Sequence, residues 1–327
     1  MGKKKLSVVI PCYRVKRHVL EVLVGIGPEV DAIYIVDDCC PEGSGGHVQA
    51  NCGDKRVRVL FHEKNLGVGG ATLTGYLEAL KEDAEIIIKI DGDGQMDPAL
   101  IRQFVRPIEE GLADYTKGNR FFCIEDLQQM PLVRLIGNSF LSFLSKFSSG
   151  YWNVFDPTNG YTAISAAVAA KLPFDKIDRR YFFESDMLMR LNIFRAVVLD
   201  IPMSARYGDE TSSLRIARII PEFLAKYVLN GFKRLFYTYY LRDFNVASIE
   251  ILMGFCALLF GIIFGARMWY ISVTTGVTAT SGTVMLAALP TLIGIQLILA
   301  FLTYDVGNIP KYTLTNLLQE RPRNDAQ

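Results

Sequence analysis

The stretch Ile86-Ile-Ile-Lys-Ile-Asp-Gly-Asp-Gly-Gln-Met-Asp97 decides the fold. It starts with five residues that are mostly β-branched and apolar, a run too short for a helix, and then brings three carboxylates within seven positions. This pattern predicts a buried central strand that delivers Asp91 and Asp93 to one edge of a sheet. Residues two apart in a strand point the same way, so both carboxylates can converge on one hard cation. Taken alone, the pattern is also explained by an acidic turn after a strand.

Size and composition limit the class of protein. The chain has 327 residues, which is room for two domains or for one large domain with an appendage. Its 35 Lys and Arg residues balance 34 Asp and Glu residues, so no nucleic-acid partner is expected. Half of the residues (50%) are hydrophobic and the mean hydropathy is +0.22, which is high for a soluble protein. The hydrophobic excess lies after residue 245.

The N-terminus and the cysteines indicate a cytosolic catalytic part. The first apolar run extends only from Leu6 to Ile10 before a proline, which is too short for the hydrophobic region of a signal peptide. The six cysteines lack the C-x-x-C spacing of metal sites, so reduced thiols are expected. The vicinal pair Cys39-Cys40 has two interpretations, redox activity or packing in a turn, and packing is favoured.

Strands and helices alternate along the first two hundred residues. Strands are expected over residues 6–10, 32–36, 56–61, 86–90 and 196–201, with a short one after residue 114. Helices are expected over residues 15–25, 65–81, 98–110 and 131–147, and from about residue 181. The alternation predicts an α/β fold with a mostly parallel central sheet, in which ligands bind beyond the carboxyl ends of the strands.

Three polar segments follow strands at their carboxyl ends. They are Pro11-Cys-Tyr-Arg14, Asp37-Asp38 and Asp91-Gly-Asp93. Since parallel strands end at the same edge, that edge is expected to form a site.

The glycine-rich loop Asn65-Leu-Gly-Val-Gly-Gly-Ala71 matches neither common phosphate-binding motif. A dinucleotide fingerprint needs a third glycine where Thr72 stands, and a Walker loop needs Gly-Lys-Ser/Thr, which is absent. Two interpretations stay open. The loop is a helix N-terminus that lets a phosphate or ribose approach backbone N–H groups, or its glycines allow close helix packing.

Two further helices carry candidate residues. Apolar residues recur at helical spacing from Pro131 to Phe147, which favours a core-facing helix. The helix that begins near Tyr181 carries Glu184 and Asp186. Asp186 is either a general base or an ordinary first-turn acid favoured by the helix dipole.

The last third of the chain has the pattern of a membrane anchor. Residues 215–243 interleave aromatic and aliphatic side chains with Lys and Arg, which suits the surface of an anionic membrane. The only charge from Val246 to Ala266 is Glu250, and residues 282–303 carry none. Each of these spans can cross a hydrocarbon core of about 30 Å, so a transmembrane hairpin is favoured over a buried soluble pair.

The basic residues predict the orientation of this hairpin. Lys and Arg crowd the segments before the first span and after the second, whereas the connecting loop has only Arg267 at its edge. Both termini and the catalytic domain are therefore expected to be cytoplasmic, at a bacterial inner membrane. The expected division is a catalytic domain (1–214), an amphipathic juxtamembrane helix region (215–243), a hairpin (244–305) and a cytoplasmic tail (306–327).

Six motifs occur in an order that is informative as a set. They are Val8-Val-Ile-Pro-Cys-Tyr13, Val36-Asp-Asp38, Asn65-x-Gly67 with Ala71, Asp91-Gly-Asp93-Gly-Gln95, Lys117-Gly-Asn-Arg120 and Glu184-Ser-Asp186. Their order resembles the inverting family 2 glycosyltransferases with the GT-A fold, over about residues 6–214. The basic helix and hairpin that follow are similar to those of the membrane-bound polyprenyl-phosphate sugar transferases in that family.

The resemblance implies a donor site. The nucleotide sugar would be lined by Pro11, Tyr13, Asp38, Asn65, Gly67 and Asp91, with Asp38 near the base or ribose. Asp93 would bind Mg²⁺ or Mn²⁺ that bridges the donor diphosphate, Asp91 is the second metal candidate, and Gln95 would lie beside the metal.

The acceptor phosphate would be held by arginines. The candidates are Arg120, Arg134 and Arg206, because guanidinium groups match phosphate oxygens, and Arg206 fits the family pattern best. The chain departs from the family at Ser213-Leu214, where a lysine commonly follows the serine. Arg206 or Arg215 would then have to supply that contact.

Three functions follow as hypotheses. In the first, a metal-dependent hexosyltransferase moves a sugar from a nucleotide-diphosphate sugar to polyprenyl phosphate at the bilayer, for cell-envelope glycan synthesis. In the second, the acceptor is a hydroxyl of a glycolipid or growing glycan, with Asp186 as the base. In the third, the chain is a non-catalytic nucleotide-binding membrane scaffold, which would have no need for Asp91, Asp93, Gln95 and Asp186 together. The sugar, the base, the lipid length and a homo-oligomeric state stay open.

Overall fold

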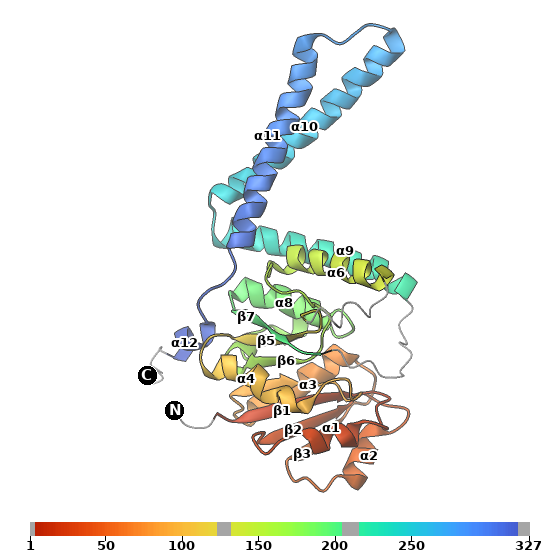
Figure 1. Cartoon of the computed structure of the whole chain (residues 1–327), viewed down its shortest axis with the longest axis vertical. Helices are drawn as coiled ribbons and strands as arrows, with labels where there is room; N and C mark the ends of the chain where they lie inside the picture. Colours follow the sequence, from red (N-terminus) through yellow and green to blue (C-terminus); the bar gives the residue numbers. More distant parts are fainter. Residues whose placement is uncertain (1–3, 123–131, 205–215, 320–327) are drawn as a thin grey trace. The chain divides into compact units, whose positions relative to one another are not determined.

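Two compact units make up the chain. The computed structural model describes residues 4–122, 132–204 and 216–319 (Figure 1). One unit contains residues 1–231 together with 310–327, and the other contains residues 232–309. We call them the catalytic unit and the hairpin unit, and each is described by itself.

The catalytic unit is built on one seven-stranded sheet of order β3-β2-β1-β4-β6-β5-β7. The strands are β1 (Leu6–Cys12), β2 (Ala32–Asp37), β3 (Val57–Phe61), β4 (Ile86–Lys89), β5 (Tyr115–Asn119), β6 (Thr162–Ser165) and β7 (Val198–Pro202). β6 runs antiparallel to β4 and β5, and the other pairs are parallel. The predicted α/β fold with a mostly parallel sheet is confirmed.

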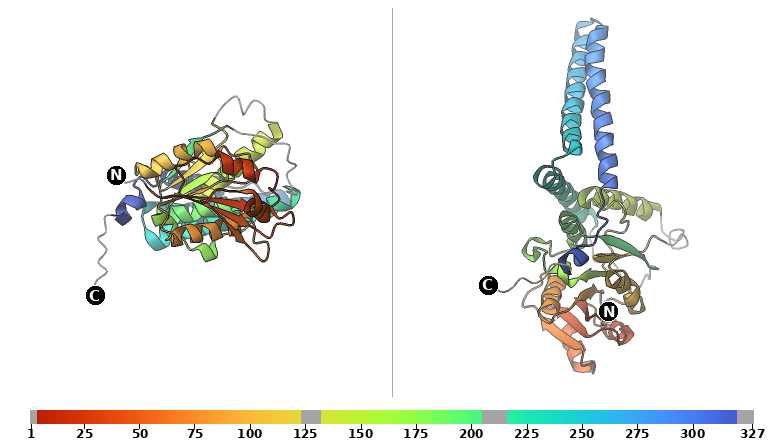
Figure 2. Two further views of the ribbon diagram at one scale, coloured as in Figure 1. Left: turned by 90° about the horizontal axis from the view of Figure 1, so that it is seen from below. Right: turned by 90° about the vertical axis from the view of Figure 1, so that its left-hand side faces the viewer.

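Helices cover both faces of this sheet (Figure 2). The helices that contact the sheet include α2 (Ser44–Asn51), α3 (Val68–Lys81), α4 (Ile101–Glu109) and α7 (Ala166–Ala169). The other helices are α1 (Val19–Gly25), α6 (Leu132–Ser149), α8 (Phe183–Phe194), α9 (Ile216–Phe236, which crosses the unit boundary) and α12 (Leu314–Gln319). Short 3₁₀ turns occupy Pro98–Leu100 and Phe174–Lys176. β1, β2 and β4 are buried along their whole length, as expected for strands that are covered on both faces.

Helix α6 differs from its prediction. The expectation that its apolar residues face the core is wrong for Phe140 and Phe143, whose exposed fractions are 56% each. Its buried face is formed by serines, among them Ser145 and Ser148. A Cβ on Gly231 of α9 would lie 3.7 Å from the Ser148 Cα, so small residues allow the two helices to pack closely.

The tail after the hairpin folds back onto the catalytic unit. Asp114, which is fully buried, accepts hydrogen bonds from the backbone N–H groups of Leu314 and Thr315 (2.8 Å each) and from the Thr315 hydroxyl (2.6 Å). Residues 306–327, predicted as a separate tail, therefore contain a segment that belongs to the catalytic unit.

The hairpin unit contains two long hydrophobic helices, α10 (Val246–Thr275) and α11 (Ser281–Gly307), each with a mean hydropathy of 2.3 in its most apolar window. They pack closely because a Cβ on Gly294 would lie 2.6 Å from the Leu258 nitrogen. Only 22% and 11% of the two windows are buried, unlike the core helices of soluble proteins. Their lengths of about 45 and 40 Å exceed a hydrocarbon core of about 30 Å. These helices are the candidate membrane spans.

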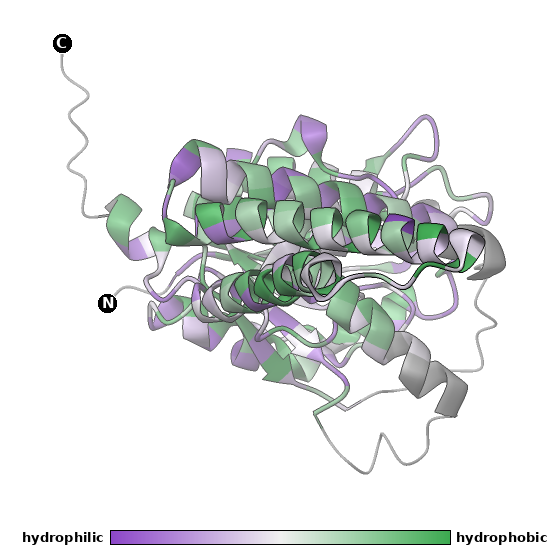
Figure 3. Cartoon of the chain, turned by 90° about the horizontal axis from the view of Figure 1, so that it is seen from above, coloured by the Kyte–Doolittle hydropathy of each residue, from purple (hydrophilic) through white to green (hydrophobic). Residues whose placement is uncertain are grey.

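The segment before the first span contains helix α9, and its amphipathic character stays a prediction. Hydrophobic and hydrophilic residues mix along α9 (Figure 3). On its catalytic-unit part, Leu224, Val228 and Leu229 are exposed. The helix continues into a π-helical turn, Tyr237–Arg242, before α10 begins.

Candidate active site

The carboxyl ends of the parallel strands bring the predicted donor residues to one edge of the sheet. Pro11 pairs with Val36 across β1 and β2, and Val9 pairs with Lys89 across β1 and β4. The segments that follow these strands, including Tyr13, therefore start side by side. β4 and β5 are both antiparallel to β6, which lies between them, so they run in the same direction. β7 is parallel to β5, so β5 and β7 also end at this edge.

Asp38 organises the glycine-rich loop. Its Oδ1 accepts a hydrogen bond from the Leu66 N–H and its Oδ2 one from the Gly67 N–H, both at 2.8 Å. The His62 Nδ1 also lies 2.8 Å from Oδ1, and the Asn65 side chain donates to the Asp38 carbonyl at 3.2 Å. The buried carboxylate is thus already used within the protein. Its role beside a base or ribose stays a prediction.

The glycines of that loop serve close packing. Gly67 has a φ of +88°, and a Cβ there would lie 2.5 Å from the Arg179 carbonyl oxygen. The Gly70 N–H donates to the same carbonyl at 3.0 Å. Of the two interpretations of this loop, the structure supports the packing one.

Lys89 is a site residue that the sequence pattern did not reveal. Its side chain is 1% exposed, and its Nζ lies 2.8 Å from Asp91 Oδ1 and 3.1 Å from Glu184 Oε1. Burial alone would lower the pKa of Lys89, but the charges of the two carboxylates outweigh it and raise that pKa above its usual value. The available signal was a lysine inside an apolar strand, two residues before Asp91 and hence on the same face.

Asp93 lies in a tight turn after β4. Its Oδ1 accepts a hydrogen bond from the Gln95 N–H (2.9 Å), and Gly94 between them has a φ of +79°. Within the described residues, no group of three or more His, Cys, Asp or Glu side chains could hold a metal. Because Lys89 already pairs with Asp91, a hard cation at this edge would rely on Asp93 and on oxygens of a ligand. The Asp93 carboxylate therefore fits a cation whose remaining ligands are oxygen atoms of a bound ligand.

Asp186 is engaged on both of its carboxylate oxygens. Oδ2 accepts hydrogen bonds from the Asp178 N–H and from Arg190 Nε (2.9 Å each), and Oδ1 accepts one from the Asn230 side chain (2.8 Å). The residue is 4% exposed and joins α8 to α9. These contacts weigh against the general-base interpretation and favour a structural role.

Arg120, a predicted phosphate ligand, is paired with a carboxylate. Its Nε donates to Asp156 Oδ2 at 2.8 Å and its Nη2 donates to Oδ1 at 3.1 Å. Arg120 would therefore have to share its guanidinium with an acceptor. The side chain of Arg134 and all of Arg206 and Arg215 lie outside the described residues.

Two charged residues lie in the middle of β5 and β7: Lys117, which is buried, and Asp200, which is half-buried. Lys117 donates to the Asn159 carbonyl, and burial lowers its pKa to about 8. Asp200 accepts hydrogen bonds from the Asn119 side chain (2.9 Å) and the Phe155 N–H (3.0 Å), and burial raises its pKa to about 6. The sequence pattern assigns neither side chain an individual role.

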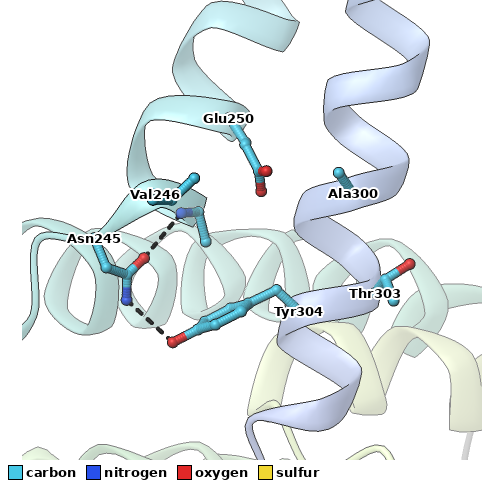
Figure 4. A pocket seen from close by; sticks show the side chains of 7 residues that line it. Asn245, Val246, Glu250, Ala300, Thr303 and Tyr304 are labelled. Carbon is cyan, nitrogen blue, oxygen red and sulfur yellow. Dashed lines mark hydrogen bonds between the residues drawn. The ribbon is translucent and has the colours of Figure 1, made fainter.

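The hairpin unit has a crevice of its own. It is lined by Asn245, Val246, Ala247, Glu250, Ala300, Thr303 and Tyr304 (Figure 4). The Asn245 side chain donates to the Tyr304 hydroxyl at 3.2 Å. Of the predicted donor and phosphate residues that the structure describes, none lines this crevice.

Comparison with known proteins agrees with the fold and the motif order. Residues 7–172 match the model of glycosyl transferase family 2. A UDP-N-acetylglucosamine–dolichyl-phosphate N-acetylglucosaminyltransferase of Methanococcus voltae is 28% identical, covering 64% of this chain and 88% of that protein. An undecaprenyl-phosphate mannosyltransferase of Micrococcus luteus is 26% identical, covering 54% of this chain and 72% of that protein.

A solved structure supports the fold. Glucosyl-3-phosphoglycerate synthase from Mycobacterium tuberculosis, solved with Mn²⁺, UDP and glucosyl-3-phosphoglycerate, superposes with a TM-score of 0.53 at 17% identity. The match covers 71% of this chain and 80% of that one. With its GT-A fold and its matching domain, the chain is a glycosyltransferase and belongs to glycosyl transferase family 2.

Proposed function

We propose that the protein transfers a sugar from a nucleotide-diphosphate sugar to polyprenyl phosphate, with inversion at the anomeric carbon, to give a polyprenyl-phosphate sugar. The main observation behind this proposal is that one chain contains both a family 2 domain and two hydrophobic helices long enough to cross a membrane. Relatives named for transfer to dolichyl phosphate and undecaprenyl phosphate support the choice of acceptor.

The donor would bind at the edge where β1, β2 and β4 end. Pro11 and Tyr13 would line the nucleotide, and Asp38 would hold the Asn65–Gly67 loop in shape beneath it. Asp93, with Asp91 beside it, would hold Mg²⁺ or Mn²⁺, which when bound stabilises negative charge on the departing diphosphate. Gln95 would lie beside that metal.

A phosphate acceptor needs no general base, because it is already anionic at neutral pH. Both carboxylate oxygens of Asp186 already accept hydrogen bonds, which agrees with this chemistry better than with activation of a hydroxyl. The protein's contribution is then to orient the two substrates and to stabilise the leaving group. Arginines are proposed to hold the acceptor phosphate: Arg120, Arg134 and Arg206.

The active site is proposed to face the cytoplasm at a bacterial inner membrane. Chain segments on both sides of the hairpin belong to one compact unit, which supports an even number of crossings. The basic residues that flank the two spans support the cytoplasmic side.

A donor screen tests the proposal. The purified full-length protein is incubated with polyprenyl phosphate and single nucleotide sugars, with and without MnCl₂, and the lipid products are identified by mass. We expect one donor to give a metal-dependent polyprenyl-phosphate sugar. A product formed only on a hydroxyl acceptor would contradict the proposal, and no turnover with any donor would favour the scaffold hypothesis.

A further inference from the structure

Lys89 is the central member of a buried group of three charges. It lies in β4, the central strand of the sheet. Its partners are Asp91, which follows the carboxyl end of β4, and Glu184 in the first turn of α8. The exposed fractions of the lysine and glutamate side chains are 1% and 9%. Asp91, at 28%, is the member that reaches the surface of the predicted donor site.

The space around this group is closed by Gly160. A Cβ on that glycine would meet the Lys89 Nζ and would lie 2.5 Å from Asp91 Oδ2. The glycine belongs to the turn-rich segment from Asp156 to Tyr161, whose first residue pairs with Arg120. A side chain at this position would therefore force the ammonium group or the Asp91 carboxylate to shift.

The balance of charge has a consequence for an anionic ligand. One cation against two carboxylates leaves a net charge of −1 in this group. Without the lysine, the two carboxylates would have no cation between them, and the group would carry −2. A nucleotide diphosphate bound beside Asp91 would then meet stronger repulsion, or an Asp91 that has moved.

We propose that Lys89 is a positioning residue for the donor site, which fixes Asp91 against Glu184 and offsets their charge so that a nucleotide diphosphate with its cation can bind beside Asp91. The inference rests on the proposed function, because it assumes a nucleotide-diphosphate donor.

The chain offers a matched control. Lys117 is also fully buried. Thr162 of β6 pairs with Lys89 on one neighbouring strand, β4, and with Lys117 on the other, β5. The hydrogen bond that its Nζ donates goes to the Asn159 carbonyl. Loss of either lysine therefore removes a buried cation from the same face of the sheet, but only Lys89 contacts Asp91.

The test measures binding of UDP and of GDP, each with MnCl₂, to the full-length protein in lipid nanodiscs by isothermal titration calorimetry. We expect Lys89→Met to weaken binding of the nucleotide that the wild type prefers by at least tenfold. Lys117→Met should keep the affinity within threefold of wild type, although both variants melt at lower temperature. The double variant Lys89→Met/Glu184→Gln restores the net charge of −1, and we expect it to recover at least half of the lost affinity in logarithmic units.

Gly160→Ala provides a second route to the same answer if Lys89→Met does not fold. It removes no charge but pushes on the lysine and Asp91, so the same loss of affinity is expected. Wild-type affinity in Lys89→Met or Gly160→Ala would overturn the inference, and equal losses in Lys89→Met and Lys117→Met would reduce Lys89 to a structural role. If the wild type binds neither UDP nor GDP, nor CDP, ADP or dTDP under the same conditions, the proposed function itself fails, which is a different result.

Discussion

The half-buried Asp200 in the middle of β7 makes the stability of the catalytic unit depend on pH. Burial raises the pKa of Asp200 to about 6, so the folded protein binds a proton more tightly than the unfolded chain does. The stabilisation from this proton is fully present below about pH 4 and is lost as the pH rises through 6. Above that pH, the folded protein holds a buried carboxylate whose Oδ1 has no hydrogen-bond partner in the described part of the chain.

Asp200→Asn should therefore stabilise the protein at neutral pH. The amide keeps an oxygen for the Asn119 and Phe155 donors and remains uncharged, so the expected gain at pH 7.5 is up to about 3 kcal/mol. Melting temperatures of the two proteins from pH 4.5 to 8 measure it. We expect the curves to meet at low pH and to separate as the pH rises, and parallel curves would contradict the assignment.

Gly67 is the second residue whose contribution can be measured directly. Its φ is +88°, and an added Cβ would lie 2.5 Å from the Arg179 carbonyl oxygen, so Gly67→Ala is strained, with an expected loss of about 2 kcal/mol or more. Gly46→Ala is the control, because that glycine has open space around it within α2 and alanine favours helix. Thermal melting should show opposite shifts, and a neutral Gly67→Ala would mean that the loop adapts.

At this scale, the sequence pattern predicts the position of a site better than the roles within it. Asp91 and Asp93 follow the end of β4, since the end of a strand is a local property of the sequence, and their convergence on one cation stays a prediction. Arg120 pairs with Asp156, which is 36 positions away in the chain, and one partner of Asp186, Asn230, is 44 positions away, so no local pattern could foresee these two contacts. Lys89 was missed for the same reason, because Glu184 lies 95 residues from it.

Among the secondary-structure elements, those with strong periodicity were predictable and those held by tertiary contacts were not. The two spans, α3 and α8 follow from hydrophobic patterns. Helix α2 begins Ser-Gly-Gly, a poor helix-forming sequence, and is supported by Asp37, whose Oδ2 accepts a hydrogen bond from the Gly45 N–H at 2.6 Å. Helix α12 has only six residues and depends on Asp114.

The docking of α12 is an element-scale prediction. The Thr315 hydroxyl donates to Asp114 at 2.6 Å in a fully buried contact, so Thr315→Val removes a hydrogen bond to a carboxylate, worth about 1.5–3 kcal/mol. We expect α12 to detach and the chain near Lys311 to become sensitive to limited trypsin digestion. Thr303→Val, where the hydroxyl bonds only within its own helix, should leave the digestion pattern unchanged. A wild-type pattern in Thr315→Val would show that this hydrogen bond is dispensable.

For the whole molecule, the return of the chain to the catalytic unit constrains the membrane topology. Because α12 bonds to Asp114 of the sheet, the segments before α10 and after α11 must lie on the same side of a bilayer that the two helices cross. The loop between these helices must then lie on the opposite side. This conclusion does not depend on counting basic residues, whereas the proposal that the catalytic side is cytoplasmic does.

Cysteine labelling in intact cells tests this topology. In a background without native cysteines, Ala279→Cys lies in the loop between α10 and α11, and Tyr312→Cys replaces a residue that is 82% exposed after α11. A membrane-impermeant maleimide added outside the cells should label the first variant and not the second, and permeabilisation should expose the second. Labelling of Tyr312→Cys from outside would reverse the orientation, whereas protection of both positions would mean that the hairpin does not cross the bilayer.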